Sequence, residues 1–501
     1  MNPSTTPPGY QGNLSPLQQA RLQELWTLLL HLAEASSLGA LEAIVGRGNR
    51  LQQVSSRLSS PSLSPSTSRR NSLFSRTDSK LVRKDSRVSI PYSGSTSIYH
   101  LRLLETLRDV GFTESQVRRV RRFLNLMPPE EVRFGVLTAA KHEHPDVYLL
   151  RYLRVSKWDV TKALAHLLDS LVWRAKEMQV DEVLLPRGEL YAVRNEGNAL
   201  NAFKAGEARG FMAQLRMGKA FVHGLDRMGR PVAVVRIRLH RPGEQSEEAL
   251  NQFITHVVES VRLLIVAPVE TATVLFDMTG FSLANMEYAP VKFIIRCFET
   301  YYPDCLGVLL IHNAPRVFNG VWKIIKPWMD QRIVEKIVFT RTVADLEKYI
   351  DRDRIPTELG GSEDWEYEYV EPEPDENRVM ADVATRDALL AERQSVGEQF
   401  LDATARWIAA SQGGGGGDDR IQMERMHRLR DGMAERIRRN YWDLDPYVRA
   451  RNVLDRTGVI LEGGCVDMYP TGRPQVPVQI QTAKILQVEH VQRAQVKLVN
   501  V

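Results

Sequence analysis

The spacing of hydrophobic residues predicts two helical segments in the N-terminal part of the chain, residues 1–51 and 99–205. From residue 14 to 33 the apolar side chains recur every three or four positions and form a single stripe. The same spacing recurs further on, most clearly after Asp159, which is a good N-cap for the helix that it precedes. The stripe of the first segment consists of Leu22, Leu25, Trp26, Leu29 and Leu32.

The residues between these segments, 52–98, have a different composition. Ser, Pro, Arg and Lys dominate, and too few apolar side chains remain to form a core. We expect a disordered linker. Basic residues precede Ser72 and Ser86, so both serines are candidate phosphorylation sites, and an inert solvated linker is the alternative.

A pattern of alternating strands and helices begins near residue 206. Helices with one apolar face separate four strand-like runs. The order strand–helix–strand predicts an α/β domain over residues 206–370, with a mixed, largely parallel sheet. The predicted strands are Pro231–Leu239, Thr271–Phe276, Gly307–Ile311 and Lys336–Thr340.

The C-terminal residues 371–501 are more polar. An acidic stretch precedes a predicted helix around 380–410, a glycine hinge at 413–417 and a basic helix near 418–440. We predict a helical extension, and its helices are the candidate docking site for a protein partner. The apolar stripe of the basic helix consists of Met426, Leu429, Met433 and Ile437.

Composition and charge exclude several classes of function for this chain. The chain has 501 residues with a formal net charge of +5, which is too small to indicate nucleic-acid binding. Its 3 cysteines cannot form a disulfide framework or a CxxC metal site, which favours a reducing compartment. The start of the chain lacks a signal-peptide pattern, and no segment reaches the roughly 18–20 apolar residues that span a bilayer. We expect a cytoplasmic protein that meets membranes peripherally.

No catalytic motif is complete in the sequence. A phosphate-binding P-loop requires a glycine where Ala213 stands before Gly218 and Lys219. His142 and His144 lack the HExxH spacing of a zinc site, which favours capping or surface histidines, and there is no GxSxG elbow. We therefore expect no catalytic residues, no metal and no cofactor, and a binding protein in place of an enzyme.

A series of short motifs, in order over residues 146–365, resembles the CRAL-TRIO lipid-binding family. The two ends of the chain, Gly12–Trp26 and Asn440–Ile460, resemble a fungal branch of that family classed with phosphatidylinositol transfer proteins. The resemblance implies a helical lobe and a lipid cavity with a sheet as its floor and a mobile gate helix. The motifs are LLRYLRVSKWD at 149–159, GLDRMGRP at 224–231, FDMTGF at 276–281, YPDCLG at 302–307, NAP at 313–315, KPWMD at 326–330 and IPTELGG at 355–361.

The segment Val317–Met329 has the composition of the gate helix. It is apolar on nearly all sides, yet it carries Lys323 and Lys326, which we expect to contact the membrane. A helix that covers a pocket and meets the bilayer interface explains both features, and a core helix with snorkelling lysines is the alternative. The expected lining of cavity and gate consists of Phe276, Phe318, Val321, Trp322, Ile325, Trp328 and Met329.

The resemblance also assigns a headgroup site. In the phosphatidylinositol-transfer members, an acidic residue after the YP pair and a lysine after the gate organise the inositol phosphate, and the matching positions are Asp304 and Lys336. A plain salt bridge is the alternative for each residue. Two other inositol-site positions depart from the pattern, because Ser156 stands in place of a basic residue and Ile333 in place of a threonine.

The positions of the family's phosphatidylcholine-contacting hydroxyls are apolar here, at Ala272 and Val274. A choline headgroup therefore fits poorly. We predict a lipid-transfer protein that carries one lipid, phosphatidylinositol in the first place, between membranes. A sterol-like or isoprenoid lipid carrier and a lipid-regulated scaffold are the alternatives.

Overall fold

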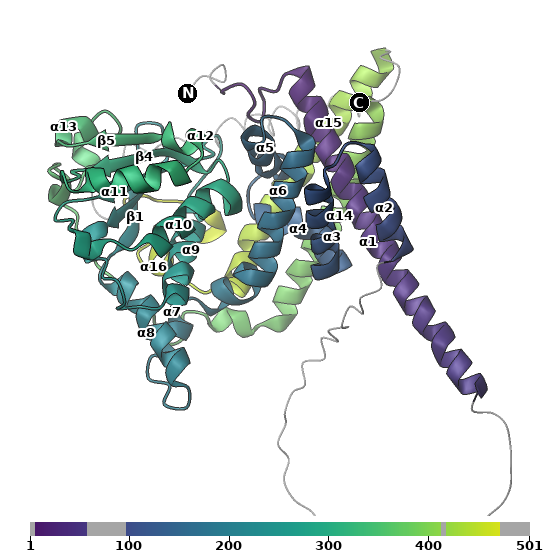
Figure 1. The fold of residues 1–501 in the computed structure, drawn as a ribbon, viewed down its shortest axis with the longest axis horizontal. Helices are drawn as coiled ribbons and strands as arrows, with labels where there is room; N and C mark the ends of the chain where they lie inside the picture. The colour runs from purple at the N-terminus through teal and green to yellow at the C-terminus, as the bar shows by residue number, and fades with distance from the viewer. Residues whose placement is uncertain (1–5, 58–96, 412–416, 471–501) are drawn as a thin grey trace, which may run out of the picture. The chain divides into compact units, whose positions relative to one another are not determined.

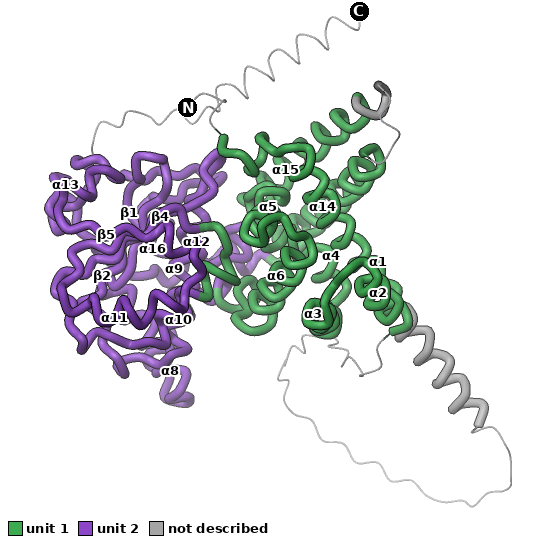
Figure 2. The backbone as a smooth tube through the Cα atoms, turned by 45° about the horizontal axis from the view of Figure 1, so that its top comes forward, with its two compact units in different colours: residues 1–184, 296–305, 383–444 green, residues 185–295, 306–382, 445–501 purple. Residues whose placement is uncertain are grey.

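The computed structural model describes residues 6–57, 97–411 and 417–470, which divide into two compact units (Figures 1 and 2). Unit 1 consists of Met1–Leu184, Arg296–Cys305 and Val383–Leu444, and unit 2 consists of Leu185–Ile295, Leu306–Asp382 and Asp445–Val501. The predicted C-terminal extension is thus divided between the two units. Ser72, Ser86 and residues 413–416 of the predicted hinge lie outside the described residues.

Unit 1 is built from helices, as the spacing of its apolar residues predicts. Side chains cap several of them at the start: Asp159 accepts a hydrogen bond from the backbone N–H of Lys162, and Thr113 forms a capping box with Gln116. The helices are α1 (Pro16–Arg57), α2 (Ile98–Asp109), α3 (Glu114–Leu126), α4 (Pro129–Ala140), α5 (Pro145–Val155), α6 (Val160–Val172), α14 (Val383–Ser411) and α15 (Gly417–Val448), whose last residues belong to unit 2.

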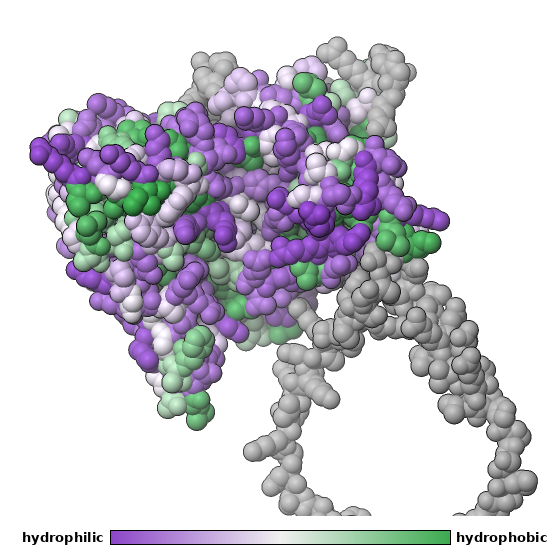
Figure 3. All heavy atoms as spheres, in the orientation of Figure 1, coloured by the Kyte–Doolittle hydropathy of each residue, from purple (hydrophilic) through white to green (hydrophobic). Residues whose placement is uncertain are grey.

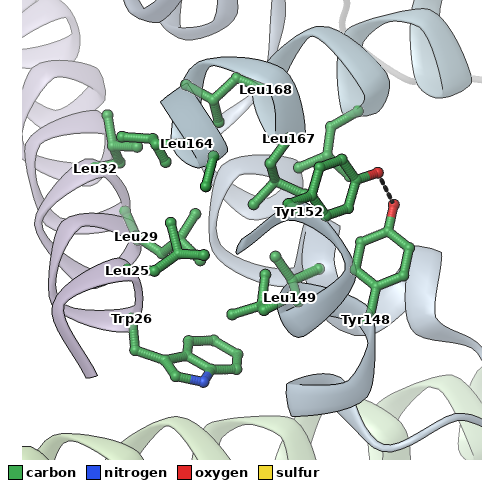
Figure 4. Close-up of a cluster of buried hydrophobic side chains, with 14 of the residues drawn as sticks. Leu25, Trp26, Leu29, Leu32, Tyr148, Leu149, Tyr152, Leu164, Leu167 and Leu168 are labelled. Atoms are coloured by element: carbon green, nitrogen blue, oxygen red, sulfur yellow. Dashed lines mark hydrogen bonds between the residues drawn. The ribbon is translucent and has the colours of Figure 1, made fainter. Parts of the chain in front are cut away.

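One apolar core joins the helices of unit 1. The predicted stripe of α1 is buried and packs with side chains of α5 and α6 (Figure 4). The C-terminal helices belong to the same core, because Phe400 and Trp407 of α14 and Met426 and Ile437 of α15 lie in one cluster with Trp26. The apolar side of α15 is therefore used inside the protein.

A buried ion pair fixes α15 in this core. Arg430 donates hydrogen bonds of 2.9 and 2.6 Å to the carboxylate of Asp146, which also accepts one of 2.7 Å from the indole of Trp26. Burial by itself would raise the pKa of Asp146, but the charges of Arg430 and His144 lower it below its usual value. The predicted stripe on α15 is wrong at Leu429, which is 41% exposed, because the neighbouring Arg430 faces inward to reach Asp146.

Unit 2 contains a five-stranded sheet in the order β1-β2-β3-β4-β5. The strands are β1 (Ala220–Leu225), β2 (Pro231–Arg236), β3 (Ala272–Asp277), β4 (Leu306–His312) and β5 (Ile337–Thr340). β1 pairs antiparallel with β2, and every other pair is parallel, so the predicted mixed, largely parallel α/β sheet is confirmed.

Helices cover both faces of this sheet. In Figure 2 the strands lie between α13 on one side and α10 and α11 on the other. The helices of unit 2 are α7 (Leu185–Asn195), α8 (Ala202–Arg216), α9 (Glu247–Leu263), α10 (Tyr288–Arg296), α11 (Phe318–Ile325), α12 (Gln331–Val334), α13 (Val343–Leu346) and α16 (Val453–Arg456). No helix of the described residues is long and apolar enough to cross a membrane.

Several boundaries differ from the prediction. Strand β1 was not expected, and the strand predicted from Pro231 ends at Arg236. The predicted gate helix stops at Ile325 and continues as a 3₁₀ turn, Lys326–Trp328, because Pro327 has no N–H to donate. Helix α1 runs to Arg57, into the range predicted as a linker, since helical spacing alone does not mark where a helix ends.

Candidate functional site

The sheet of unit 2 presents one face that is entirely apolar. Strand register aligns two rows of side chains across β2, β3, β4 and β5. Because side chains alternate between the two faces of a strand, both rows point to the same side of the sheet. These apolar rows are Ala233, Val274, Leu309 and Ile337, and next to them Val235, Phe276, Ile311 and Phe339.

The opposite face of the sheet is a closed core. Its strand residues include Leu275 and Leu310, both 0% exposed, and they pack against side chains of the chain that follows β5. The residues that cover this closed face are Leu346, Ile350, Ile355 and Leu359.

The apolar rows are less completely covered than the closed face. Val235, Phe276 and Ile337 are half-buried, and Phe339 is 49% exposed. At the β2 side, Val235 packs against a cluster that contains Leu250 of α9. The other residues of the rows, Ala233, Val274, Leu309 and Ile311, are buried. The predicted cavity residue Phe276 therefore lies among buried apolar side chains and keeps part of its own surface exposed.

Helix α11 reaches these rows at Phe339. The ring of Trp322 lies edge-on to that of Phe339 at 5.2 Å between centroids, and Phe318 contacts Phe281 at 5.7 Å. Of the residues predicted for the gate, Phe318, Val321 and Ile325 are buried on one side of the helix, and Trp322, Trp328 and Met329 are half-buried.

The outer side of α11 combines apolar and basic groups. Lys323 and Lys326 are exposed, as are Ile324 and Val317. Figure 3 shows hydrophobic side chains gathered over this helix. The helix is thus amphipathic, with an apolar inner side and an outer side of mixed character.

The two predicted headgroup residues have polar partners within their own units. Asp304 of unit 1 accepts a hydrogen bond of 2.6 Å from Arg154, and both side chains are largely buried. Arg154 also lies 4.0 Å above the ring of Tyr10. Lys336 of unit 2 is half-buried, and its Nζ donates a hydrogen bond of 2.6 Å to the carbonyl of Leu306. Sequence reasoning missed the partnership of Arg154 with Asp304.

The positions that depart from the family pattern have defined places in the structure. Ser156 is the C-cap of α5, and Arg332, next to Ile333, pairs with Asp330 at 2.9 Å. Ala272 and Val274 are buried, and strand alternation places both on the side of the apolar rows. The sheet floor therefore has no hydroxyl at either position.

The histidines and cysteines that were candidate metal ligands or nucleophiles have capping or packing roles in the structure. His144 caps α5 by accepting a hydrogen bond from the N–H of Asp146, as expected of a capping residue. His142 was expected at a cap or on the surface, but it is buried against the ring of Trp442 at 5.0 Å. Burial raises the pKa of the Cys297 thiol, which disfavours a reactive thiolate. The described part of the chain contains no cluster of His, Cys, Asp or Glu that could hold a metal ion.

Comparison with known proteins identifies the family. The CRAL/TRIO domain matches residues 215–361, and the CRAL/TRIO N-terminal domain matches residues 129–169. The chain is 35% identical to CRAL-TRIO domain-containing protein C3H8.02 of Schizosaccharomyces pombe, over 90% of this chain and 92% of that protein. It is 38% identical to phosphatidylinositol transfer protein CSR1 of Eremothecium gossypii, over 64% of this chain and 69% of that protein.

A crystal structure of Sfh5 aligns with a TM-score of 0.34 at 15% identity, over 53% of this chain and 88% of that one. The chain belongs to the CRAL-TRIO family, whose members bind and transfer lipids and are in general not enzymes.

Proposed function

We propose that this protein binds one phosphatidylinositol molecule with its acyl chains against the apolar rows of unit 2, and carries it between membranes. It works in the cytoplasm and attaches to membranes peripherally through α11. The observation that carries the proposal is the pair of apolar rows, which contain no polar side chain and keep part of their surface exposed, most of all at Phe339.

The energetics of lipid extraction explain why such a surface is needed. Each methylene transferred from a bilayer into water costs about 0.8 kcal/mol, so a lipid with about thirty methylenes would cost on the order of 20 kcal/mol to remove unaided. A carrier must offer an apolar wall nearly equivalent to the bilayer. The apolar rows and the inner side of α11, with Phe318 and Trp322, provide side chains of that kind.

The choice of phosphatidylinositol is supported by the similarity to a phosphatidylinositol transfer protein and by two charged residues. We assign Lys336 to the lipid phosphate, because an ammonium group binds phosphate strongly. We assign Asp304 to the inositol hydroxyls or to the orientation of basic groups, since it already accepts a hydrogen bond from Arg154.

The outer side of α11 supports a role at the membrane. Exposed Ile324 and Val317 can enter the interfacial layer, while Lys323 and Lys326 remain near lipid phosphates. Release of the lipid then requires only that α11 move away from Phe339 on contact with the bilayer, so that the lipid exchanges between two surfaces of similar apolar character.

The first experiment is extraction of lipids from the purified full-length chain, followed by mass spectrometry. Stoichiometric phosphatidylinositol of unchanged mass supports the proposal. A sterol-like lipid would favour the alternative that Ala272 and Val274 suggest, a carrier of apolar lipids. Absence of any lipid would favour a scaffold, which should not transfer lipid between vesicles.

Substitution of Lys336 tests the headgroup site. Loss of a charged hydrogen bond of about 1.5–3 kcal/mol predicts that Lys336→Ala transfers phosphatidylinositol more than tenfold more slowly, with sterol binding nearly intact. Lys348→Ala removes an exposed lysine of the same unit and should transfer at the parent rate. Equal rates for Lys336→Ala and the parent would contradict the assignment.

A further inference from the structure

A second basic surface lies on α3 in unit 1. Its inner side, with Val120 and Phe123, is buried in the core of that unit. At about 100° per residue, the exposed arginines of this helix fall within an arc of about 160°. They form an arginine face, which consists of Arg118, Arg119, Arg121 and Arg122.

Nearby acids balance this charge only in part. Arg119 pairs with Asp169 at 3.2 Å and Arg122 with Glu177 at 2.7 Å, and both arginine side chains remain about half exposed, at 47% and 50%. Exposed pairs of this kind are weak and open readily to a competing anion. Arg118 and Arg121 have no ion-pair partner within the part of the chain that the structure describes.

The one acid at the start of the helix is already engaged. Glu114 accepts a hydrogen bond of 2.6 Å from Arg108 of α2. This bond is the main reason that the pKa of Glu114 is lowered, and the charges of Arg118 and Arg121 lower it further. The arginine face thus has an excess of positive charge.

Exposed aliphatic side chains lie at both ends of the arginine face. Leu126 ends α3 and is 44% exposed, and Val110, just before the helix, is 59% exposed. Guanidinium groups bind phosphates bidentately, and aliphatic side chains next to them can enter the headgroup layer. A bilayer that contains anionic lipids offers both partners along the whole face, because its phosphates meet the guanidinium groups and its interfacial layer accepts the aliphatic side chains at both ends.

We propose that the arginine face of α3 is a docking surface for bilayers that contain anionic phospholipids, in addition to the contact proposed for α11. The inference rests on the proposed function only because a lipid carrier must meet membranes. Each basic side chain close to an anionic surface strengthens partitioning about fivefold, so the face contributes through several weak contacts.

The test is sedimentation of the full-length chain with vesicles of two parts phosphatidylcholine to one part phosphatidylserine. The double variant Arg118→Ser/Arg121→Ser should bind about 25-fold more weakly, since two such contacts are lost. Binding to vesicles of phosphatidylcholine alone should be unchanged, and so should the thermal midpoint of unfolding, because both side chains are exposed.

A matched control separates this face from net charge. Arg425→Ser/Arg428→Ser makes the same charge change at exposed positions of α15 in the same unit, and it should bind like the parent. The proposal is overturned if both double variants lose vesicle binding equally, or if Arg118→Ser/Arg121→Ser loses none. Unchanged binding by Arg118→Ser/Arg121→Ser would favour an acidic protein as the partner of this face.

Transfer of a trace of phosphatidylinositol between vesicles of phosphatidylcholine, which are then nearly neutral, separates this inference from the proposed function. The Arg118→Ser/Arg121→Ser variant should transfer there at the parent rate if both proposals hold. A parent protein that transfers no phosphatidylinositol refutes the carrier, while sedimentation still decides whether the arginine face binds anionic bilayers.

Discussion

Both faces of the sheet in unit 2 carry apolar side chains, yet they are covered in different ways, and only the closed face also carries polar ones such as Thr273 and Asp277. On the closed face, Leu275 and Leu310 lie beneath side chains such as Ile350 and Ile355 and have no exposed surface. On the other face, Phe276 is half-buried and Phe339 is 49% exposed. A sheet that serves only as a core is sealed on both sides by the chain itself. The closed face therefore stabilises the fold. Because the face with the apolar rows is less completely covered, we assign lipid binding to that face.

The largest effect on stability is expected from substitutions at two neighbouring residues of β3 whose side chains point to opposite faces of the sheet. Leu275→Ala should lower the free energy of unfolding by about 2–5 kcal/mol, because it leaves a cavity in a sealed core. Phe276→Ala removes more carbon but should cost less, since half-buried side chains lose less on truncation. Urea denaturation of both variants checks this, and a greater loss for Phe276→Ala would mean that the apolar rows are also sealed.

Acid should weaken the packing of α7 against α9 and α16 in unit 2, where a buried carboxylate joins these helices. Glu189 contacts His256 of α9 at 3.1 Å, accepts a hydrogen bond of 2.8 Å from Tyr369 and pairs with Arg456. Burial would raise its pKa, but the hydrogen bond and charge of His256 and the charge of Arg456 lower it from 4.5 to about 2.

Because the pKa of Glu189 is lower in the folded state, its stabilising contribution is complete above the ordinary value of 4.5 and is lost as the pH falls toward about 2. The contribution is on the order of 3 kcal/mol. Urea midpoints measured from neutral pH downward should fall in this window. The Glu189→Gln variant should have a lower free energy of unfolding at neutral pH, and its urea midpoint should fall less as the pH is lowered. A parent-like dependence of the midpoint on pH would refute this role of Glu189.

The smallest effect on stability, with a clear effect on binding, is expected at the centre of the apolar rows. Phe276→Asn places an amide against the acyl chains, and an unpaired polar group there costs about 1–3 kcal/mol, so phosphatidylinositol transfer should fall by a factor of about 5 to 150. Phe276→Leu keeps the surface apolar and should transfer almost normally. Parent-like transfer by Phe276→Asn would remove the apolar rows from the lipid site.

The sequence by itself determined the elements and much of the proposed site. Alternation and helical spacing are local properties, so they indicated the strands β2 to β5, the helices of unit 1 and the amphipathic segment at Phe318–Ile325. Family motifs indicated Asp304 and Lys336. Strand β1 was not predicted, because its place in the sheet depends on antiparallel pairing with β2, and the sequence of one strand does not show that pairing.

Only the tertiary structure decided which charges meet and which sheet face is sealed. Arg430 and Asp146 are separated by 284 positions in the chain, and Arg154 and Asp304 by 150, so no local pattern indicates either pair. Leu275 and Leu310 of the closed face are as apolar as the side chains of the apolar rows, and they are sealed because Ile350 and its neighbours pack on them. Local sequence sets which side chains are apolar, whereas contacts between distant segments decide which of them remain accessible to a ligand.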